Sequence, residues 1–471
     1  MPIQTLSVVL AAGASSRMKS PTSKLLHSVL GRSLIHLALD QASAITNSVI
    51  FVVGHQREAV EAAVEKLAAP SLKIQFALQE KLIGTADAVK AALKALEGVD
   101  DQADIFIMGA DSGLLLRESL IQFKKNHEAS GAVLSVMTTV ASHPNSYGRI
   151  LRNSQGAMEA IIEAKDATDA ELAISEVNTG FYLVKLFALK EALSKISNQN
   201  RSKEFYLTDM VSYARQRGWL IYSQQIALEE AAGVNTQADL VAFGEILQNR
   251  INHKWMKEGV RFLDPRSTFI DFDVKIQAGV VLESGVHLRG ETSLGENVHV
   301  SAYSILSNVD VGTNTRIESF SHLKDCRIGK DSSVGPFARI RGNAVLENDV
   351  HVGNFVEIKK SHLHSGTKSG HLAYLGDAEI GRNSNIGAGT ITCNYDGFKK
   401  SQTTIGENVF IGSNSSLVAP VKIGDNAIVG AGSVITKDVE AESLAVERSD
   451  QREIKEGAKK FRSRRENSNK K

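Results

Sequence analysis

Apolar positions along the chain follow two different patterns, and the change falls near Asp264. In the first part, short apolar runs such as LSVVLAA, SVIFVVG, ADIFIMGA and GAVLSVMTTV alternate with amphipathic stretches such as SLIHLALDQASAI. Strands alternating with helices are typical of a mostly parallel sheet covered on both faces, so residues 1–235 predict a Rossmann-like α/β domain. Ligands of such sheets bind at the carboxyl ends of the strands, which here means the loops after Val9, Val53 and Met108.

A single long linker helix is expected over residues 236–256. Apolar side chains recur there at helical spacing, at Leu240, Phe243, Ile246, Leu247, Ile251 and Trp255. Thr236 followed by Asp239 resembles a capping box in which Asp replaces Glu, and this places the start of the helix.

Beyond Asp264 an aliphatic residue recurs at every sixth position. Two unbroken series show this, namely Ile328, Val334, Ile340, Leu346, Val352 and Ile358, and Ile405, Ile411, Leu417, Ile423, Val429 and Ile435. One buried side chain per short strand indicates a solenoid, and such hexapeptide repeats resemble the left-handed parallel β-helix, with three strands in each triangular coil. Residues 257–449 are therefore predicted to form this fold. The segments SHLHSGTKSGHLAYLGD and TITCNYDGFKKSQ interrupt the repeat and are expected to project as loops.

Composition excludes several classes of protein. Lys and Arg number 54 against 53 Asp and Glu, so there is no general positive field for nucleic acid or a membrane surface. No run of 18 apolar residues occurs, which predicts a cytoplasmic chain without membrane insertion. Cys326 and Cys393 lie outside any CxxC spacing, which argues against a disulfide framework or a cysteine zinc site. Residues 450–471 are polar and basic and predict a disordered tail.

A loop of small residues, LAAGASSRM, leaves the first strand and is followed by Lys24. Backbone N–H groups of such a loop can approach phosphates closely, and Arg17 and Lys24 supply positive charge. By itself this spacing also fits an ordinary strand-to-helix turn. The residues of this segment, however, resemble the LAAGxGTRM loop and following lysine of sugar-1-phosphate nucleotidyltransferases. Serines stand at positions 15, 16 and 23 where that family has Gly, Thr and Pro.

The resemblance continues through LQEKLIGTADA, MGADSG, SYGRI, IIEAKDATD, EVNTG and AGVNT. It implies that UTP is bound by Leu10, Ala11, Ala12, Gly13, Lys24, Gln79, Gly84, Thr85, Gly109, Ala110 and Asp111. It implies that N-acetylglucosamine-1-phosphate is bound by Gly148, Glu163, Asn178 and Asn235. In the family the equivalents of Asp111 and Asn235 hold Mg²⁺, and Arg17 and Lys24 are the implied catalytic cations that stabilise the departing pyrophosphate.

The segment around Asp111 departs from the family pattern. Gly109-Ala110-Asp111-Ser112-Gly113 stands where the family reads Tyr-Gly-Asp-x-Pro, and Asp87 replaces the histidine of GTxHA. The added glycine and lost proline predict a more flexible loop. An alternative for this half is therefore a nucleotide-binding scaffold that no longer reacts, and Asp111 alone could also be a simple cap after a strand.

The later segments RIRGNAVLENDVHVGNFVEIKKS, KSGHLAYLGDAEIG and NIGAGTITCNYDGFKK closely resemble glucosamine-1-phosphate acetyltransferase domains. The resemblance implies that His371 is the general base for the substrate amine as it attacks acetyl-CoA, with Glu357 orienting the ring. It implies a glucosamine-1-phosphate site formed by Arg341, Lys359, Tyr374 and Asn385. It implies an acetyl-CoA site formed by Ala388, Asn394, Tyr395, Ser413, Ala431 and Arg448. The tetrahedral intermediate also needs an oxyanion donor, for which backbone N–H groups near Ala388 are candidates.

In order along the chain, the motifs from Leu10 to Arg448 resemble the family of bifunctional N-acetylglucosamine-1-phosphate uridyltransferases and glucosamine-1-phosphate acetyltransferases. The resemblance implies a homotrimer acting on small molecules, whose product UDP-N-acetylglucosamine feeds peptidoglycan and lipopolysaccharide synthesis. The rival hypothesis is a sugar-1-phosphate nucleotidyltransferase with a structural or regulatory β-helix. The HLAYLGD and TCNYDG segments speak against it, because a purely structural coil has no need of His371 in a projecting loop.

Overall fold

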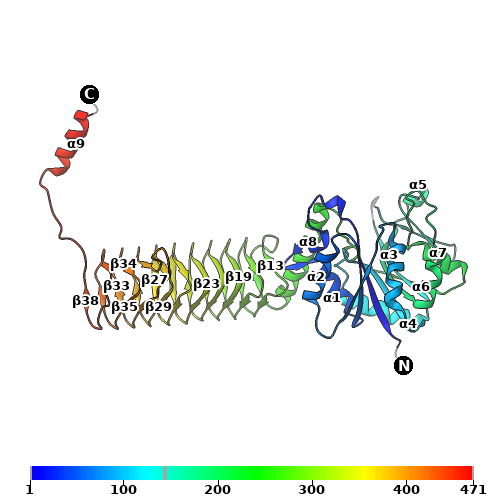
Figure 1. Cartoon of the computed structure of the whole chain (residues 1–471), viewed down its shortest axis with the longest axis horizontal. Coiled ribbons are helices and arrows are strands. Elements are labelled where there is room, and N and C mark those ends of the chain that lie inside the picture. Colours follow the sequence, from blue (N-terminus) through cyan, green and yellow to red (C-terminus); the bar gives the residue numbers. More distant parts are fainter. Residues whose placement is uncertain (1–2, 142–145, 469–471) are drawn as a thin grey trace. The chain divides into compact units, whose positions relative to one another are not determined.

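The computed structural model describes residues 3–141 and 146–468 and divides into two compact units, Met1–Ile251 and Asn252–Lys471 (Figure 1). The first unit is built on a sheet with strand order β11-β7-β10-β6-β1-β4-β5. Its strands are β1 (Thr5–Ala11), β4 (Ser48–Val53), β5 (Lys73–Leu78), β6 (Asp104–Gly109), β7 (Leu134–Val140), β8 (Arg149–Arg152), β9 (Met158–Ile162), β10 (Glu176–Lys185) and β11 (Ile221–Gln225). β1 runs parallel to β4 and β6, whereas β10 is antiparallel to β6 and β7. The predicted mostly parallel sheet is confirmed.

Helices cover both faces of this sheet because its central strands are apolar on both sides. Leu6 and Val8 of β1 belong to one buried cluster, and Val9 and Ala11 belong to the other. The helices of the unit are α1 (Leu34–Ala42), α2 (Arg57–Leu67), α3 (Thr85–Ala92), α4 (Arg117–Ser130), α5 (Asp169–Leu172), α6 (Leu186–Leu193) and α7 (Asp209–Gln216). Short 3-10 turns, η1 (Ser16–Met18) and η2 (Lys24–Leu26), shape the loop after β1, and β2 (Ser28–Val29) and β3 (Arg32–Ser33) form a small hairpin. Two further 3-10 turns are η3 (Leu93–Leu96) and η4 (Leu228–Glu230).

The predicted linker helix is α8 (Gln237–Lys257). Its start follows the expected capping box, because the Thr236 backbone N–H donates to Asp239 Oδ2 (2.8 Å) and the Asp239 N–H donates to Thr236 Oγ1 (3.1 Å). The division between the two units falls inside this helix, after Ile251.

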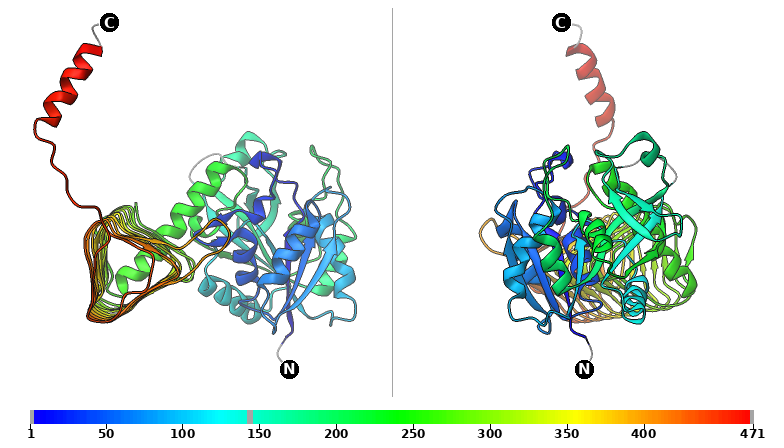
Figure 2. Two further views of the ribbon diagram at one scale, coloured as in Figure 1. Left: turned by 60° about the vertical axis from the view of Figure 1, so that its left-hand side comes forward. Right: turned by 90° about the vertical axis from the view of Figure 1, so that its right-hand side faces the viewer.

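The second unit is the predicted solenoid, and Figure 2 shows its triangular cross-section. Its strands are β12 (Arg261–Phe262), β13 (Phe269–Ile270), β14 (Lys275–Ile276), β15 (Val281–Leu282), β16 (His287–Arg289), β17 (Ser293–Leu294), β18 (His299–Val300), β19 (Ile305–Val311), β20 (Arg316–Ile317), β21 (His322–Ile328), β22 (Ser333–Val334), β23 (Arg339–Leu346), β24 (His351–Asn354), β25 (Glu357–Lys359), β26 (His362–Leu363), β27 (Lys368–His371), β28 (Tyr374–Gly376), β29 (Ala378–Ile380), β30 (Asn385–Ile386), β31 (Ile391–Cys393), β32 (Thr403–Ile405), β33 (Phe410–Ile411), β34 (Ser416–Val418), β35 (Val421–Ile423), β36 (Ile428–Val429), β37 (Val434–Ile435) and β38 (Leu444–Ala445). Named strands of neighbouring coils pair in parallel, as Phe410 pairs with Ile428, 18 positions on. Every residue of the two sixfold series is buried, which confirms the left-handed parallel β-helix of hexapeptide repeats.

The prediction that SHLHSGTKSGHLAYLGD projects as a loop is wrong. β26, β27 and β28 continue the coils, but the pairing shortens from 18 positions (Ile340 with Ile358) to 17 (Ile358 with Leu375). Because this coil is one residue shorter, its inward-facing positions shift to Leu363, Ser369 and Leu375, which are all fully buried. A search for apolar residues at every sixth position therefore misses them.

The segment TITCNYDGFKKSQ does leave the coil after β31, because the pairing lengthens to 25 positions between Ile386 and Ile411. An antiparallel bridge between Tyr395 and Lys400 closes this loop, which we call the 394–402 loop, and Phe398 in it is 97 % exposed.

The C-terminal tail differs from the expected disordered segment, because it contains helix α9 (Gly457–Ser468). Its sequence GAKKFRSRRENS is rich in Lys and Arg, which are good helix formers, and holds no β-branched residue or proline. Residues 469–471 lie outside the described part. Among residues 3–141 and 146–468, no helix combines the length and the hydropathy needed to cross a bilayer.

Two candidate active sites

A cavity of about 420 Å³ lies at the carboxyl ends of the strands of the first unit. Residues predicted for UTP and for the sugar phosphate line it together, namely Leu10, Ala12, Gly13, Gln79, Gly84, Thr85, Gly109, Asp111, Glu163 and Asn178. Ala11 and Ala110 are buried beside these lining residues in the chain. Tyr182 and Thr208 also line the cavity. The sequence did not predict them as site residues, because no motif marks them.

The predicted cations and oxygen ligands meet at one point. The Lys24 ammonium forms an ion pair with Asp111 Oδ2 and donates to Asn235 Oδ1 (3.0 Å) and to the Val234 carbonyl (2.9 Å). Arg17 Nη2 also donates to Asn235 Oδ1 (2.9 Å). These residues come from three widely separated parts of the chain, and their oxygens converge on a single positive charge.

Asn235 is positioned by the start of α8. Its backbone N–H donates to Asp239 Oδ2 (3.0 Å), and the Val234 N–H donates to the Asp111 carbonyl (3.1 Å). The capping carboxylate of Asp239 therefore also fixes a candidate ligand. The sequence predicts Asp239 as a cap of the helix, and its contact with the Asn235 backbone appears only in the structure.

The loop around Asp111 is more tightly packed than its glycines suggest. A Cβ at Gly113 would lie 2.8 Å from Leu37 Cβ, and a Cβ at Gly109 would lie 2.7 Å from Asp111 Oδ1. Ala110 is fully buried and its N–H donates to the Leu10 carbonyl (3.0 Å). Close packing favours a residue without a side chain at Gly113, and hydrogen bonds anchor the backbone on both sides of Asp111. The flexibility expected from the glycines stays a prediction.

Gln79 is oriented by two hydrogen-bond acceptors. Its Nε2 donates to Asp87 Oδ2 (2.9 Å) and to the Gly84 carbonyl (3.2 Å). Because both partners can only accept, the amide NH₂ group must face them, and the Gln79 carbonyl oxygen remains for a ligand. Asp87, noted in the sequence only as a departure from the family, thus has a specific structural role.

The sugar-side residues form a second connected group in the cavity. The Asn178 backbone N–H donates to the Gly148 carbonyl (2.8 Å), and Asn178 Nδ2 donates to the Tyr182 hydroxyl (2.7 Å). Thr208 Oγ1 donates to Glu163 Oε1 (3.1 Å). Burial raises the pKa of the Glu163 carboxyl above its ordinary value, while the Thr208 hydrogen bond opposes the shift. Asn235, predicted both for the sugar phosphate and for the metal, lies with Asp111 and Lys24.

In the solenoid, three cations gather on one face. β23 and β25 place Arg341 directly opposite Lys359. The ammonium of Lys400, from the 394–402 loop, and the Arg341 guanidinium lower the pKa of Lys359. Such a cluster of like charges is suited to an anion such as a phosphate. Lys400 was missed in the sequence, although the family segment NYDGFKK contains it.

His371 is oriented by Asn354 and not by Glu357, which corrects the prediction. His371 Nδ1 lies 2.6 Å from Asn354 Oδ1, and the two residues are register partners in β27 and β24. Glu357 Oε1 instead accepts from Arg341 Nε (2.8 Å) and lies 2.7 Å from Arg341 Nη2. With an amide oxygen facing Nδ1, that nitrogen carries the proton and Nε2 of the neutral ring can act as a base.

The predicted acetyl-CoA residues continue a column that begins at His371. Pairing of Ser369 with Ile386, Ile386 with Ile411 and Ile411 with Val429 places His371, Ala388, Ser413 and Ala431 at equivalent corners of successive coils. Arg448 Nη1 donates to the Ala431 carbonyl (2.8 Å) and extends the column. Coils are about 4.8 Å apart, so the column offers small side chains to a long, extended ligand.

The remaining predicted residues lie around this column. Asn394 is 8 % exposed, and its Nδ2 donates to Asp377 Oδ2 (2.5 Å), which ties the 394–402 loop to the coil. Tyr395 is exposed in that loop, and its hydroxyl donates to the Gly397 carbonyl (2.6 Å). Tyr374 is the register partner of Glu357, whereas Asn385 lies in a different ladder, opposite Lys368 of the His371 strand.

Comparison with known proteins gives consistent matches. Residues 6–229 match the nucleotidyl transferase family, residues 266–362 match the GMPPB C-terminal domain, and residues 402–437 match the bacterial transferase hexapeptide (six repeats). The chain is 42 % identical over 469 residues to a bifunctional protein GlmU from Streptococcus suis, with 96 % of each chain covered. It is 40 % identical over 457 residues to a protein of the same name from Listeria welshimeri, covering 97 % of this chain and 98 % of the other. It is 39 % identical over 447 residues to one from Geotalea uraniireducens, covering 94 % and 96 %.

Proposed function

The chain belongs to the family of the bifunctional protein GlmU, and we propose that its two units catalyse the two reactions of that family at two separate sites. It is an enzyme of UDP-N-acetylglucosamine biosynthesis, combining acetyl transfer from acetyl-CoA to glucosamine-1-phosphate with uridylyl transfer from UTP to N-acetylglucosamine-1-phosphate. The observation that supports this conclusion is the 42 % identity to the Streptococcus suis protein, because the alignment covers 96 % of both chains and so spans both units.

For acetyl transfer, we propose that the cation cluster of Arg341, Lys359 and Lys400 binds the phosphate of glucosamine-1-phosphate. His371 Nε2 takes the proton from the amine as its nitrogen attacks the thioester carbon, and CoA leaves as the thiolate. The hydrogen bond from His371 Nδ1 to Asn354 Oδ1 supports this role, because it keeps the tautomer with a bare Nε2. Acetyl-CoA extends from His371 along the column of Ala388, Ser413 and Ala431.

For uridylyl transfer, the sugar phosphate oxygen attacks the α-phosphorus of UTP in line, and pyrophosphate leaves without a protein nucleophile. Arg17 and Lys24 neutralise the negative charge that develops on the leaving phosphates. Glu163 and Asn178 bind the N-acetylamino sugar, and Gln79 reads the base. The free carbonyl oxygen of Gln79 suits uracil, because uracil offers an N3–H donor where cytosine offers an acceptor.

The residues also fit a magnesium ion. Asp111 and Asn235 present a carboxylate and an amide oxygen that converge on one cation, the Lys24 ammonium, and Mg²⁺ prefers such hard oxygen ligands with substrate phosphates completing its shell. We propose that these two side chains hold the ion. When bound, it would neutralise phosphate charge on the nucleotide.

We further propose a homotrimer that works in the cytoplasm. An exposed ladder of stacked rings supports the trimer, since Tyr303, Phe320, Phe337 and Phe355 are stacked at centroid distances of 5.0 to 5.3 Å and each is about half exposed. A contiguous apolar stripe of this kind is typical of an interface. Both cysteines are free thiols, which suits a reducing compartment. Light scattering that gave the mass of a single chain would contradict the trimer.

The test supplies the full chain with glucosamine-1-phosphate, acetyl-CoA, UTP and Mg²⁺, and follows CoA thiol and pyrophosphate separately. We expect release of both, with pyrophosphate depending on prior acetylation unless N-acetylglucosamine-1-phosphate is added. Thiol without pyrophosphate from added N-acetylglucosamine-1-phosphate would mean that the first unit only binds nucleotide. Pyrophosphate without thiol would favour a nucleotidyltransferase with a structural solenoid.

A further inference from the structure

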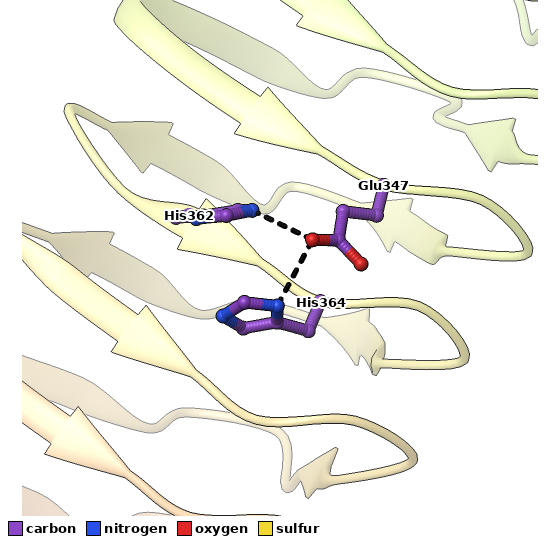
Figure 3. A group of neighbouring side chains, drawn as sticks. All are labelled: Glu347, His362 and His364. Atoms are coloured by element: carbon purple, nitrogen blue, oxygen red, sulfur yellow. Dashed lines mark hydrogen bonds and ion pairs between the residues drawn. The ribbon is translucent and has the colours of Figure 1, made fainter.

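Two histidines lie between two glutamates on a face of the solenoid that carries none of the residues assigned above. Glu347, His362, His364 and Glu379 come from three successive coils, because Val345 pairs with His362 and His362 pairs with Glu379. Figure 3 shows the first three of these side chains. His362 and His364 flank the buried Leu363, so both rings point outward from the same strand end. The four side chains are 28 to 36 % exposed, which keeps them reachable from solvent yet held by their neighbours.

Each ring nitrogen of this cluster faces a carboxylate oxygen. Glu347 Oε1 lies 3.1 Å from His362 Nε2 and 3.0 Å from His364 Nδ1. Glu379 Oε1 lies 3.2 Å from His362 Nδ1 and 2.6 Å from His364 Nε2. The second oxygen of Glu347 accepts from the Ser365 N–H (3.0 Å) and hydroxyl (2.9 Å), which fixes the carboxylate.

Protons alone satisfy this arrangement poorly. Two of the four contacts have hydrogen-bond geometry, His362 Nε2 with Glu347 Oε1 and His364 Nε2 with Glu379 Oε1. A neutral imidazole has one N–H, so two neutral rings leave the other two nitrogens with lone pairs 3.0 and 3.2 Å from carboxylate oxygens. Double protonation of both rings would instead bring two positive charges together, because the ring centroids lie only 4.2 Å apart. A divalent cation on the Glu347 side removes this conflict, because His362 Nε2 and His364 Nδ1 then act as lone-pair donors. The opposite nitrogens keep their N–H groups and face Glu379 Oε1, with His364 Nε2 in hydrogen-bond geometry (2.6 Å) and His362 Nδ1 at 3.2 Å.

We propose that Glu347 Oε1, His362 Nε2 and His364 Nδ1 bind a first-row divalent cation such as Zn²⁺, with Glu379 orienting both histidines. The three atoms lie within 4.8 Å of one another, and two of the three separations are already 3.0 and 3.1 Å. Tetrahedral zinc with bonds near 2.0 Å holds its ligand atoms about 3.3 Å apart, which is close to these two separations. A carboxylate that accepts from the outer nitrogen of each ring is the usual support of such ligands.

The donor set also separates this site from the proposed magnesium site. Imidazole nitrogens favour zinc and its neighbours, whereas Asp111 and Asn235 offer only oxygen. The ion would join two coils directly and a third through Glu379, and the other faces of these coils carry Arg341, His371 and Tyr374. The expected role is therefore structural, as a clip that holds the acetyl-transfer coils in register.

The test uses the full chain freed of metal by a chelator and returned to saturating Mg²⁺, which fills the oxygen site. Zn²⁺ binding is then measured by calorimetry and the thermal transition by circular dichroism, and Co²⁺ replaces Zn²⁺ to report tetrahedral coordination by its visible absorption. The wild type is compared with the double variant His362→Gln/His364→Gln. The matched control is His299→Gln, because His299 Nε2 pairs with Glu283 Oε1 at 2.7 Å on an earlier coil without a second histidine.

We expect the wild type and His299→Gln to bind one equivalent of Zn²⁺ that the double variant lacks, with a rise in melting temperature on zinc addition only where the equivalent binds. Equal zinc binding by wild type and double variant, or none by the wild type, would overturn the proposal. If the double variant does not fold, Glu379→Gln replaces it, and loss of an orienting carboxylate should weaken zinc binding about 10- to 100-fold. Unchanged affinity in a folded Glu379→Gln variant would equally contradict the proposed site.

Discussion

The two units build their sites in different ways. In the first unit, Lys24, Asp111 and Asn235 come from loops more than 80 residues apart and meet only because the strands of a sheet end side by side. In the solenoid, Asn354, His371 and Ala388 occupy one column because the coil repeats. A site formed by several loops depends on the separate contacts that hold each loop in place. A site on a solenoid depends on the register in which successive coils pair. Substitutions should therefore act locally in the first unit and along the column in the second.

The largest expected effect separates the two reactions. Asp111→Ala removes a carboxylate from the Lys24 and Asn235 cluster, and we expect pyrophosphate release to fall about 10²- to 10³-fold, as for the loss of a key electrostatic group. Acetyl transfer, measured as thiol release, should keep its wild-type rate. A parallel loss of both activities would mean that the units do not work independently.

A smaller effect is expected at the support of the catalytic histidine. Asn354→Ala removes the acceptor for His371 Nδ1, and we expect the kcat of acetyl transfer to fall about 10- to 100-fold, since a lost hydrogen bond to a group that becomes charged is worth about 1.5–3 kcal/mol. The comparison variant is Glu357→Gln, which touches Arg341 and not His371. That variant should raise the KM for glucosamine-1-phosphate more than it lowers kcat. The opposite pattern would restore Glu357 as the orienting residue.

The cation cluster predicts a pH effect. Lys400 and Arg341 lower the pKa of Lys359, so Lys359 loses its proton, and with it phosphate affinity, at a lower pH than an ordinary lysine. Lys400→Ala should raise the KM for glucosamine-1-phosphate severalfold at neutral pH. It should also move the alkaline rise in KM to higher pH, because one neighbouring positive charge is gone. A KM profile that shifts to lower pH, or that does not move, would contradict the cluster.

The smallest effect concerns the choice of nucleotide. Asp87→Asn replaces one of the two acceptors of Gln79 with an amide that can also donate, so only the Gly84 carbonyl still holds the Gln79 amide in one orientation. We expect the preference for UTP over CTP, measured as a ratio of kcat/KM, to drop a few-fold, with little change in the rate with UTP. An unchanged ratio would mean that Gln79 does not read the base through its carbonyl oxygen.

The sequence predicted the periodic features well and the irregular ones poorly. An aliphatic residue at every sixth position predicted the solenoid, since each buried side chain is a local requirement of its own strand. One residue fewer between Ile358 and Leu375 was enough to hide β26 to β28, and with them the pairing of Asn354 with His371 and the cluster around His364. The orientation of Gln79 by Asp87 depends on how α3 packs beside β5, and no spacing rule contains that information.

Complementation between two inactive variants tests the central claim of two independent sites most directly. His371→Ala and Asp111→Ala are each supplied with glucosamine-1-phosphate, acetyl-CoA, UTP and Mg²⁺, alone and mixed, and UDP-N-acetylglucosamine is measured. Each variant alone should form almost none, whereas the mixture should form it readily, because one variant acetylates and the other uridylylates. A mixture as inactive as its components, although both variants are folded, would contradict the assignment of the two reactions to separate sites.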